Sequence, residues 1–152
     1  METLDRRNLL AVFSALTAAG LGGSAAADPA ANLLSACKVQ RYADLPVRKF
    51  PNGGEQRRVL IGTLATGEFL EVHETMLPAG ETPHVPHKHP NSEMVFIQTG
   101  SLVHIDEDTG TTAVGPGDIL FTASNKMHDL KNVGTTPATY IVVSVSRQLP
   151  EG

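Results

Sequence analysis

Short apolar segments separated by turn signals fill the chain from Val59 onward, and none of them repeats with the 3.6-residue period of an amphipathic helix. Most combine β-branched or aromatic residues with polar residues in near alternation, which is typical of half-buried strands. This pattern predicts eight strands. The expected strands are Val59–Leu64, Phe69–Leu77, Met94–Gln98, Leu102–Asp106, Thr112–Val114, Ile119–Phe121, Asp129–Val133 and Thr139–Val145.

The breaks between these segments contain residues that form tight turns, such as Thr66-Gly67, Asp108-Thr109-Gly110 and Gly115-Pro116-Gly117. Fourteen glycines and ten prolines in 152 residues fit many short strands better than a helical bundle. The length suits one domain. The sequence therefore predicts an all-β sandwich or barrel, with the barrel over residues 59–146 and a tail over residues 147–152.

Residues 28–58 lack this regular alternation and are expected to form an irregular N-terminal extension and edge segment. A short helix is expected near Asn32–Cys37. Asp44-Leu45-Pro46 and Pro51-Asn52-Gly53-Gly54 interrupt the rest of this region.

Residues 1–27 have the composition of a cleavable export signal. Arg6-Arg7 precede an apolar stretch from Leu9 to Leu21, and Ala25-Ala26-Ala27 provide a small-residue cleavage site. The paired arginines resemble a twin-arginine signal, which exports folded proteins. An ordinary secretory signal and an uncleaved N-terminal helix are the alternatives. The expected location is therefore the periplasm or the exterior of the cell.

A single cysteine, Cys37, excludes a disulfide framework and a cysteine-based zinc site. The run Leu34-Ser35-Ala36-Cys37 resembles a lipobox, so a lipoprotein anchored through Cys37 is an alternative to a mature protein free of the membrane. A net charge of −4 and the lack of a basic cluster interleaved with aromatics argue against nucleic-acid binding.

The histidines are the strongest chemical signal in the chain. His87 and His89 are two residues apart, so on an extended segment both side chains point to one face. Glu93 shares their parity, yet on a straight strand it would lie roughly 20 Å from His87. Pro90-Asn91-Ser92 can break the strand and bring the carboxylate back. This segment predicts a metal site, and a polar histidine-rich surface loop is the alternative.

The two histidine-bearing segments resemble the two-motif signature of the cupin superfamily. The first motif is matched by Gly80, His87-Lys88-His89, Glu93 and Gly100, with one extra residue before His87. The second is matched by Gly117-Asp118 and by His128-Asp129-Leu130-Lys131-Asn132, while Ala123–Lys126 replaces the usual Pro-x-Gly. The resemblance spans residues 59–146.

This resemblance implies a small jelly-roll β-barrel in which His87, His89, Glu93 and His128 bind one divalent transition metal. Three imidazoles and a carboxylate suit Fe(II) or Mn(II), which we favour, and also Ni(II), Co(II), Cu(II) or Zn(II). The resemblance also implies a homodimer formed through edge strands of the barrel.

Other polar residues near these motifs are candidates for supporting roles. His73, His84 and Glu74 are the candidate general bases, because they lie on or near the segment that leads into the first motif. His104 is expected to face outward. Asn132 is expected to fix the loop that carries His128.

Two kinds of function fit these features. The first is a metal-dependent enzyme that acts on a small oxygen-rich molecule, as a dioxygenase first and as an isomerase or decarboxylase second. The second is a non-catalytic periplasmic module that binds a small ligand or a metal. A fold does not decide between them.

Overall fold

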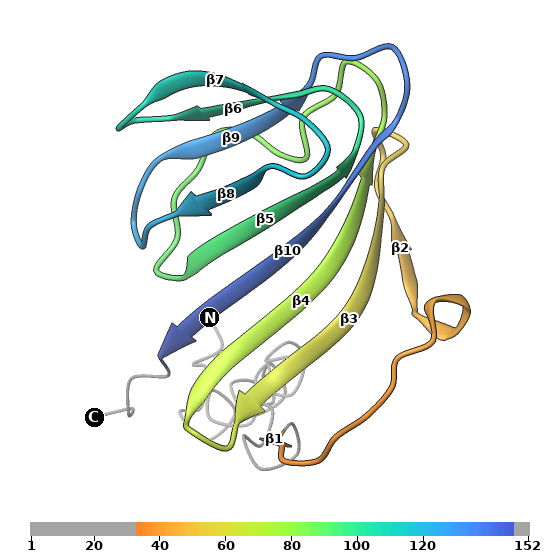
Figure 1. Ribbon diagram of the computed structural model, residues 1–152, viewed down its shortest axis with the longest axis vertical. Helices are drawn as coiled ribbons and strands as arrows, with labels where there is room; N and C mark the ends of the chain where they lie inside the picture. Colours follow the sequence, from red (N-terminus) through yellow and green to blue (C-terminus); the bar gives the residue numbers. More distant parts are fainter. Residues whose placement is uncertain (1–32, 148–152) are drawn as a thin grey trace, which may run out of the picture.

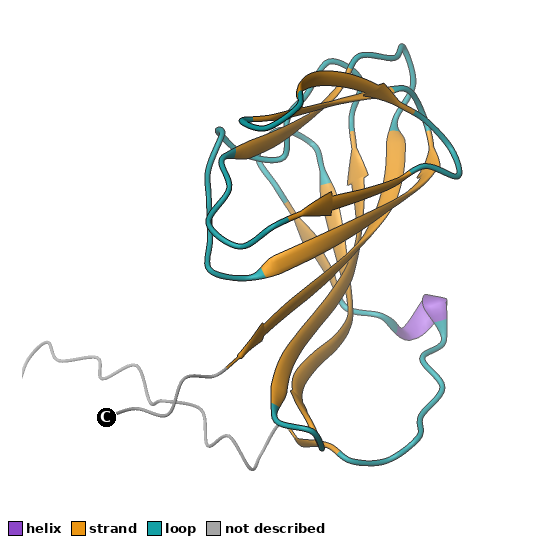
Figure 2. Ribbon diagram, turned by 60° about the vertical axis from the view of Figure 1, so that its left-hand side comes forward, coloured by secondary structure: helices purple, strands orange, loops and turns teal. Residues whose placement is uncertain are grey.

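A computed structural model describes residues 33–147, and in this part of the chain two β-sheets face each other (Figures 1 and 2). The one helical element described is a 3₁₀ turn, Tyr42–Asp44. No described helix is long and apolar enough to cross a membrane. The strands are β1 Leu33–Leu34, β2 Val47–Lys49, β3 Glu55–Leu64, β4 Glu68–Leu77, β5 Ser92–Thr99, β6 Leu102–Asp106, β7 Gly110–Val114, β8 Ile119–Thr122, β9 His128–Asn132 and β10 Ala138–Arg147.

The larger sheet has the order β1-β3-β4-β10-β5-β8, and β2 pairs with β3 beside this path. Only the β1–β3 pair is parallel among the described pairs. The smaller sheet has the order β7-β6-β9 and lies across the inner face of the larger one (Figure 1). The C-terminal strand β10 is thus central, between β4 and β5.

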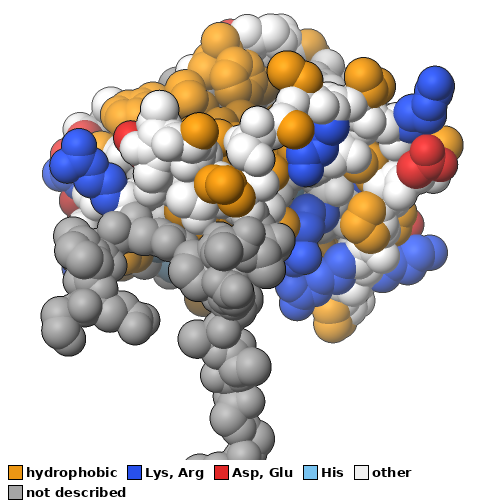
Figure 3. Space-filling view, turned by 90° about the horizontal axis from the view of Figure 1, so that it is seen from below, with side chains coloured by type: hydrophobic (Ala, Val, Ile, Leu, Met, Phe, Trp, Pro, Cys, Tyr) orange, Lys and Arg blue, Asp and Glu red, His pale blue; other side chains and the backbone are white. Residues whose placement is uncertain are grey.

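Alternation along the strands determines which side chains face outward. On β5 and β8, Met94 pairs with Phe121, and these two side chains and Ile119 are 37%, 66% and 61% exposed. They lie on the outer face of the larger sheet because their neighbours in sequence face inward. Figure 3 shows a group of hydrophobic side chains at the upper edge of the view and others scattered among polar side chains. The outer surface therefore carries apolar area that nothing in the described chain covers.

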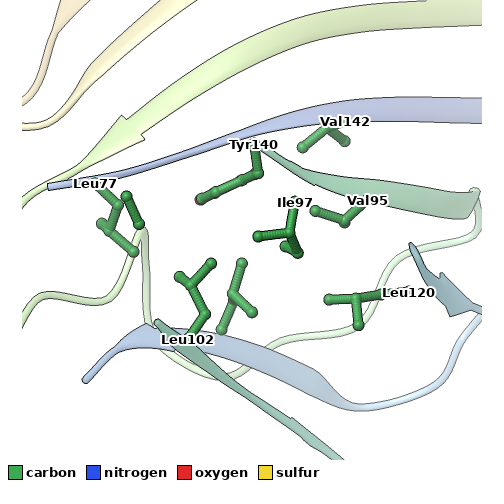
Figure 4. Packing of buried hydrophobic residues seen from close by; sticks show 9 residues of the cluster. Leu77, Val95, Ile97, Leu102, Leu120, Tyr140 and Val142 are labelled. Atoms are coloured by element: carbon green, nitrogen blue, oxygen red, sulfur yellow. The ribbon is translucent and has the colours of Figure 1, made fainter. Parts of the chain in front are cut away.

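The inward positions form the core between the two sheets (Figure 4). On β10 the buried positions alternate with half-buried ones from Ala138 to Val145, as expected for one inward face. Side chains from both sheets point toward one another in the close-up. The core consists of Leu77, Val95, Ile97, Leu102, Leu120, Leu130, Ala138, Tyr140 and Val142.

The structure confirms the predicted all-β fold and the position of all eight predicted strands. It corrects the N-terminal region, where the helix expected near Asn32–Cys37 is wrong. Leu33–Leu34 instead form β1, paired in parallel with Thr63 and Leu64. This pairing with a distant strand outweighs the local helical tendency. The strand expected to begin at Val59 begins at Glu55, and the predicted signal over residues 1–27 lies outside the described residues.

Asn132 fastens one end of the barrel, and its side chain is fully buried. Its amide Nδ2 donates to the carbonyl oxygens of Leu77, Pro78 and Thr136 at 3.0, 3.2 and 2.8 Å. Its Oδ1 accepts a hydrogen bond from the N–H of Gly134 at 3.0 Å. Asn132 therefore has a structural role, but the prediction that it fixes the loop carrying His128 is wrong, because it holds the end of β9 remote from His128.

Candidate metal site

The loop between β4 and β5 returns to the smaller sheet and pairs with β9. The His87 N–H donates to the His128 carbonyl at 3.1 Å, and the His128 N–H donates back at 2.9 Å. This isolated bridge places two histidines that are far apart in sequence directly opposite each other. The expected break in the chain before Glu93 is also present, because β5 begins only at Ser92.

The turn before His128 fixes a third histidine. Asn125 adopts a left-handed conformation with φ of 60°, which asparagine tolerates better than most residues. Its backbone N–H donates to the carbonyl of His89 at 2.8 Å. The turn over residues 123–126 therefore connects the two motif segments without the proline and glycine usual in the second motif.

Three imidazoles converge as a result. Ring centroids lie 5.2 Å apart for His87 and His89, 4.6 Å for His87 and His128, and 5.0 Å for His89 and His128. One nitrogen of each ring lies within 4.8 Å of the corresponding nitrogens of the other two. Metal–nitrogen bonds of about 2.1 Å place two ligand atoms up to roughly 4 Å apart, so small side-chain shifts bring these nitrogens to the spacing of ligands of one ion.

Backbone carbonyls set the protonation of two of these rings. His89 Nδ1 lies 3.0 Å from the Asn91 carbonyl, and His128 Nδ1 lies 2.9 Å from the Lys126 carbonyl. A carbonyl only accepts, so in a neutral ring each Nδ1 carries the proton and each Nε2 presents its lone pair. Metal-binding histidines commonly have this arrangement. In addition, Nδ1 of His87 is buried without a hydrogen-bond partner. These residues fit a metal ion.

Glu93 stands beside this group but is not part of it. Its Oε2 lies 3.5 Å from Nε2 of His89, while the set of mutually close ligand atoms contains the three histidines only. Glu93 begins β5 and lines the same cavity. The structure therefore brings together three of the four predicted ligands and places the fourth next to one of them.

The environment keeps His87 neutral. Burial, followed by the neighbouring imidazoles of His84 and His128, lowers the pKa of His87 to about 4. A proton on this ring would be poorly solvated and close to other rings that can carry charge. At neutral pH the ring is therefore unprotonated, which is the state that binds a metal.

The histidines open into one cavity of about 440 Å³ between the two sheets. His73 lies on its wall, with Nδ1 3.5 Å from Oε1 of Glu71, and burial lowers its pKa. His84 is exposed at the cavity and packs edge-on against His87, with ring centroids 3.9 Å apart. Two of the three candidate bases thus line the cavity.

The third candidate, Glu74, is not brought to the site. It follows His73 on β4, so its side chain points to the opposite face of the sheet. There it accepts a hydrogen bond from the Tyr42 hydroxyl at 2.8 Å and lies 4.0 Å from Arg57. Its surroundings on the outer face give it no path to a molecule in the cavity.

His104 was expected to face outward, and this expectation is wrong. Its side chain is buried and lines the cavity. Hydrophobic residues occur at both parities of β6, where Leu102 is buried and Ile105 is exposed, so the pattern alone does not indicate which face is inside. The signal that could have identified His104 is its spacing from Leu102. The two residues are two positions apart on one strand, so their side chains point to the same face, and Leu102 is the largest residue on that face.

Comparison with known proteins agrees with this fold. A family model described as "Cupin domain" matches residues 72–144, from within β4 to within β10. No curated protein matches the sequence.

Three solved structures illustrate the likeness in fold. An RmlC-like cupin from Shewanella frigidimarina has a TM-score of 0.62 at 13% identity, covering 74% of this chain and 94% of its own. A sugar phosphate isomerase from a cupin superfamily, from Silicibacter pomeroyi, has a TM-score of 0.58 at 21% identity, covering 72% of this chain and 76% of its own. A predicted oxalate decarboxylase from Thermotoga maritima has a TM-score of 0.58 at 23% identity, covering 71% of this chain and 98% of its own. Identities this low show the fold alone.

Proposed function

Because the chain belongs to the cupin superfamily, we propose that it is a metal-dependent enzyme that acts on a small, oxygen-rich molecule. The observation that carries this proposal is the group of three mutually close imidazoles on the wall of a cavity. Two of these rings have Nδ1 held by a carbonyl, so their Nε2 lone pairs are available. The cavity offers room for a small substrate beside them.

The metal is held by His87, His89 and His128, with Glu93 as the fourth ligand. Glu93 needs only a small side-chain adjustment, since its carboxylate already lies 3.5 Å from a ligand nitrogen of His89. When bound, the ion supplies Lewis acidity toward substrate oxygens and, for a redox-active metal, access to O₂. We favour Fe(II) or Mn(II), while Ni(II), Co(II), Cu(II) and Zn(II) suit the same ligands.

The remaining residues of the cavity bind the substrate and handle protons. His73 is the better placed general base of the two candidates, because it lies on the cavity wall with the Glu71 carboxylate 3.5 Å from its Nδ1. His84 lies at an exposed position, where it can accept a proton and release it to solvent. A dioxygenase reaction is our first choice. Isomerisation or decarboxylation is the second, and solved neighbours named as an isomerase and a decarboxylase support keeping both.

A panel of diols, diketones and phenolics, presented to the Fe(II)- or Mn(II)-loaded protein, tests the enzymatic proposal. An enzyme forms product from at least one compound, with O₂ uptake if it is a dioxygenase. The alternative, a non-catalytic module for a small ligand or a metal, gives saturable binding and no product with any metal. That second pattern across the whole panel would contradict the enzymatic proposal.

We also propose that the protein is exported to the periplasm or beyond. The support is the arrangement of basic, apolar and small residues over residues 1–27. Mass spectrometry of protein purified from its native cells tests this. A mature chain that begins at Asp28 agrees with export, and a lipidated chain that begins at Cys37 agrees with the lipoprotein alternative. An intact Met1 in all of the protein contradicts both.

The chain is further proposed to form a homodimer through the edge of the larger sheet. β8 is an edge strand, and Ile119 and Phe121 on it are more than half exposed. An exposed apolar edge strand is a template for pairing with another chain. Phe121→Glu is therefore expected to shift the protein from dimer to monomer in sedimentation experiments. Lys131→Glu, at an exposed position on β9, serves as the control and should leave the dimer intact. A wild-type monomer at micromolar concentration would refute the proposal.

A further inference from the structure

His104 is a buried imidazole that the proposed metal chemistry does not use. It lies on β6 and lines the same cavity as the three histidines of the metal site. Its Nδ1 lies 3.3 Å from Oδ2 of Asp106, two residues along the same strand. Its Nε2 is buried and has no hydrogen-bond partner. A buried nitrogen without a partner in a cavity wall is costly unless a bound molecule supplies one.

Asp106 determines which nitrogen of His104 carries the proton. Oδ1 of Asp106 accepts hydrogen bonds from the backbone N–H groups of Asp108 and Thr109 at 2.8 and 2.7 Å. The Thr109 hydroxyl donates to Oδ2. These hydrogen bonds lower the pKa of Asp106 to about 2, so the carboxylate stays ionised. An ionised carboxylate only accepts, so its position 3.3 Å from Nδ1 of His104 favours the tautomer with the proton on Nδ1, in which Nε2 presents a lone pair.

Burial and the acidic groups around the cavity act on the pKa of His104 in opposite directions, and burial has the larger effect. Burial lowers the pKa of His104 despite the nearby Asp106, so the ring is neutral. Glu71, Glu93 and Asp129 also line the cavity. A ligand group that faces Nε2 of His104 must therefore carry a hydrogen-bond donor, because a second lone pair would be repelled.

We propose that Nε2 of His104 accepts a hydrogen bond from a hydroxyl group of the molecule bound at the metal site. His104 then selects hydroxylated ligands, such as 2-hydroxy acids, over fully ionised dicarboxylates. The proposal rests on the proposed function, since it assumes that a small ligand occupies the cavity beside the metal. It deepens that function by naming a substrate class.

Two small chelators separate this effect from metal binding itself. Glycolate carries a hydroxyl and a carboxylate, whereas oxalate carries two carboxylates and no hydroxyl. The ratio of their affinities for the Mn(II)-loaded protein, measured by calorimetry, cancels differences in metal loading. In His104→Phe the affinity for glycolate divided by the affinity for oxalate should fall about tenfold. This change corresponds to the loss of one hydrogen bond to the glycolate hydroxyl. An unchanged ratio in a folded, metal-loaded variant overturns the proposal.

Asp106→Asn provides a second test that keeps the imidazole. The amide oxygen should take the position of Oδ1, since two backbone N–H groups point at it. The amide nitrogen then faces Nδ1 of His104 and donates to it, which moves the imidazole proton to Nε2. We expect the variant to favour oxalate even more than His104→Phe does, because the ring now donates into the cavity. A wild-type ratio in this variant contradicts the proposed tautomer.

Nitrogen-15 NMR of the metal-free protein distinguishes failure of this inference from failure of the proposed function. The wild-type His104 should show a protonated Nδ1 and an unprotonated Nε2. A protonated Nε2 overturns the inference whether or not a metal binds. If the tautomer is as expected but no metal loads, the proposed function fails, and the assignment of His104 to a metal-bound ligand fails with it.

Discussion

Replacing His87 with alanine is expected to lower the affinity for Fe(II) or Mn(II) by at least about a hundredfold. Even groups that only support a metal ligand typically contribute 10–100-fold to affinity, and His87 is itself a proposed ligand. Its ring lies 4.6 and 5.2 Å from the rings of His128 and His89, so its loss removes one of three converging nitrogens. Any turnover that depends on the metal should disappear with it.

The chain offers a close control for this variant. His84 packs against His87 and lines the same cavity, but its ring nitrogens are outside the group of close ligand atoms. His84→Ala should therefore leave metal affinity within a few-fold of wild type. Competition with a chromogenic chelator measures both variants, and circular dichroism checks that both barrels are folded. Equal losses in the two variants, or none in His87→Ala, would show that the histidine group is not the metal site.

Replacing Asn132 with alanine is expected to reduce the free energy of unfolding by about 3–5 kcal/mol without changing metal affinity. The side chain is fully buried, and its amide serves three carbonyls and one N–H group. Each backbone group left buried and unpaired costs about 1–3 kcal/mol, although relaxation of the loop reduces the sum. Urea unfolding of the metal-free protein measures this change.

Asn91→Ala is the matched control. Asn91 is partly buried, and its amide donates only to the Ser144 hydroxyl at 3.1 Å among the described contacts. Its loss should cost no more than about 1.5 kcal/mol. If Asn132→Ala is no more destabilising than Asn91→Ala, Asn132 does not fasten the end of the barrel. If Asn132→Ala lowers metal affinity instead of stability, the role of Asn132 is at the metal site.

Most of the fold could be predicted from the sequence because local signals agree with the tertiary structure. Strands such as β4 and β10 combine β-branched residues with turn residues at both ends, and the structure places them where this pattern predicts. β1 could not be predicted in this way. Leu33 and Leu34 form a strand only because a distant partner, β3, accepts them.

The site was predictable only where the chain itself brings residues together. His87 and His89 are neighbours, so their convergence follows from spacing, whereas His128 joins them through a bridge that no local pattern indicates. The family resemblance supplied that residue. His104 and Glu74 show the limit of the same reasoning. Successive side chains on a strand point to opposite faces, so an error of one residue moves a side chain from the cavity to the outer face.

Whether the chain folds before or after export determines which metals it can bind first. The three histidines lie on separate segments and meet only when the β4–β5 loop pairs with β9. A chain exported through the twin-arginine route, as we propose, would close this site and load its metal in the cytoplasm. Such a chain would escape the copper and zinc of the periplasm, which bind most sites of this type more tightly than iron or manganese.

Elemental analysis of the protein purified from its native compartment, without added metal, tests the metal site most directly. We expect about one equivalent of iron or manganese per chain. This metal should be lost, together with any activity, in His87→Ala, whereas His84→Ala should retain the metal. One equivalent of copper or zinc would leave the ligand group in place but contradict loading before export. The absence of bound transition metal from folded wild-type protein would contradict the site itself.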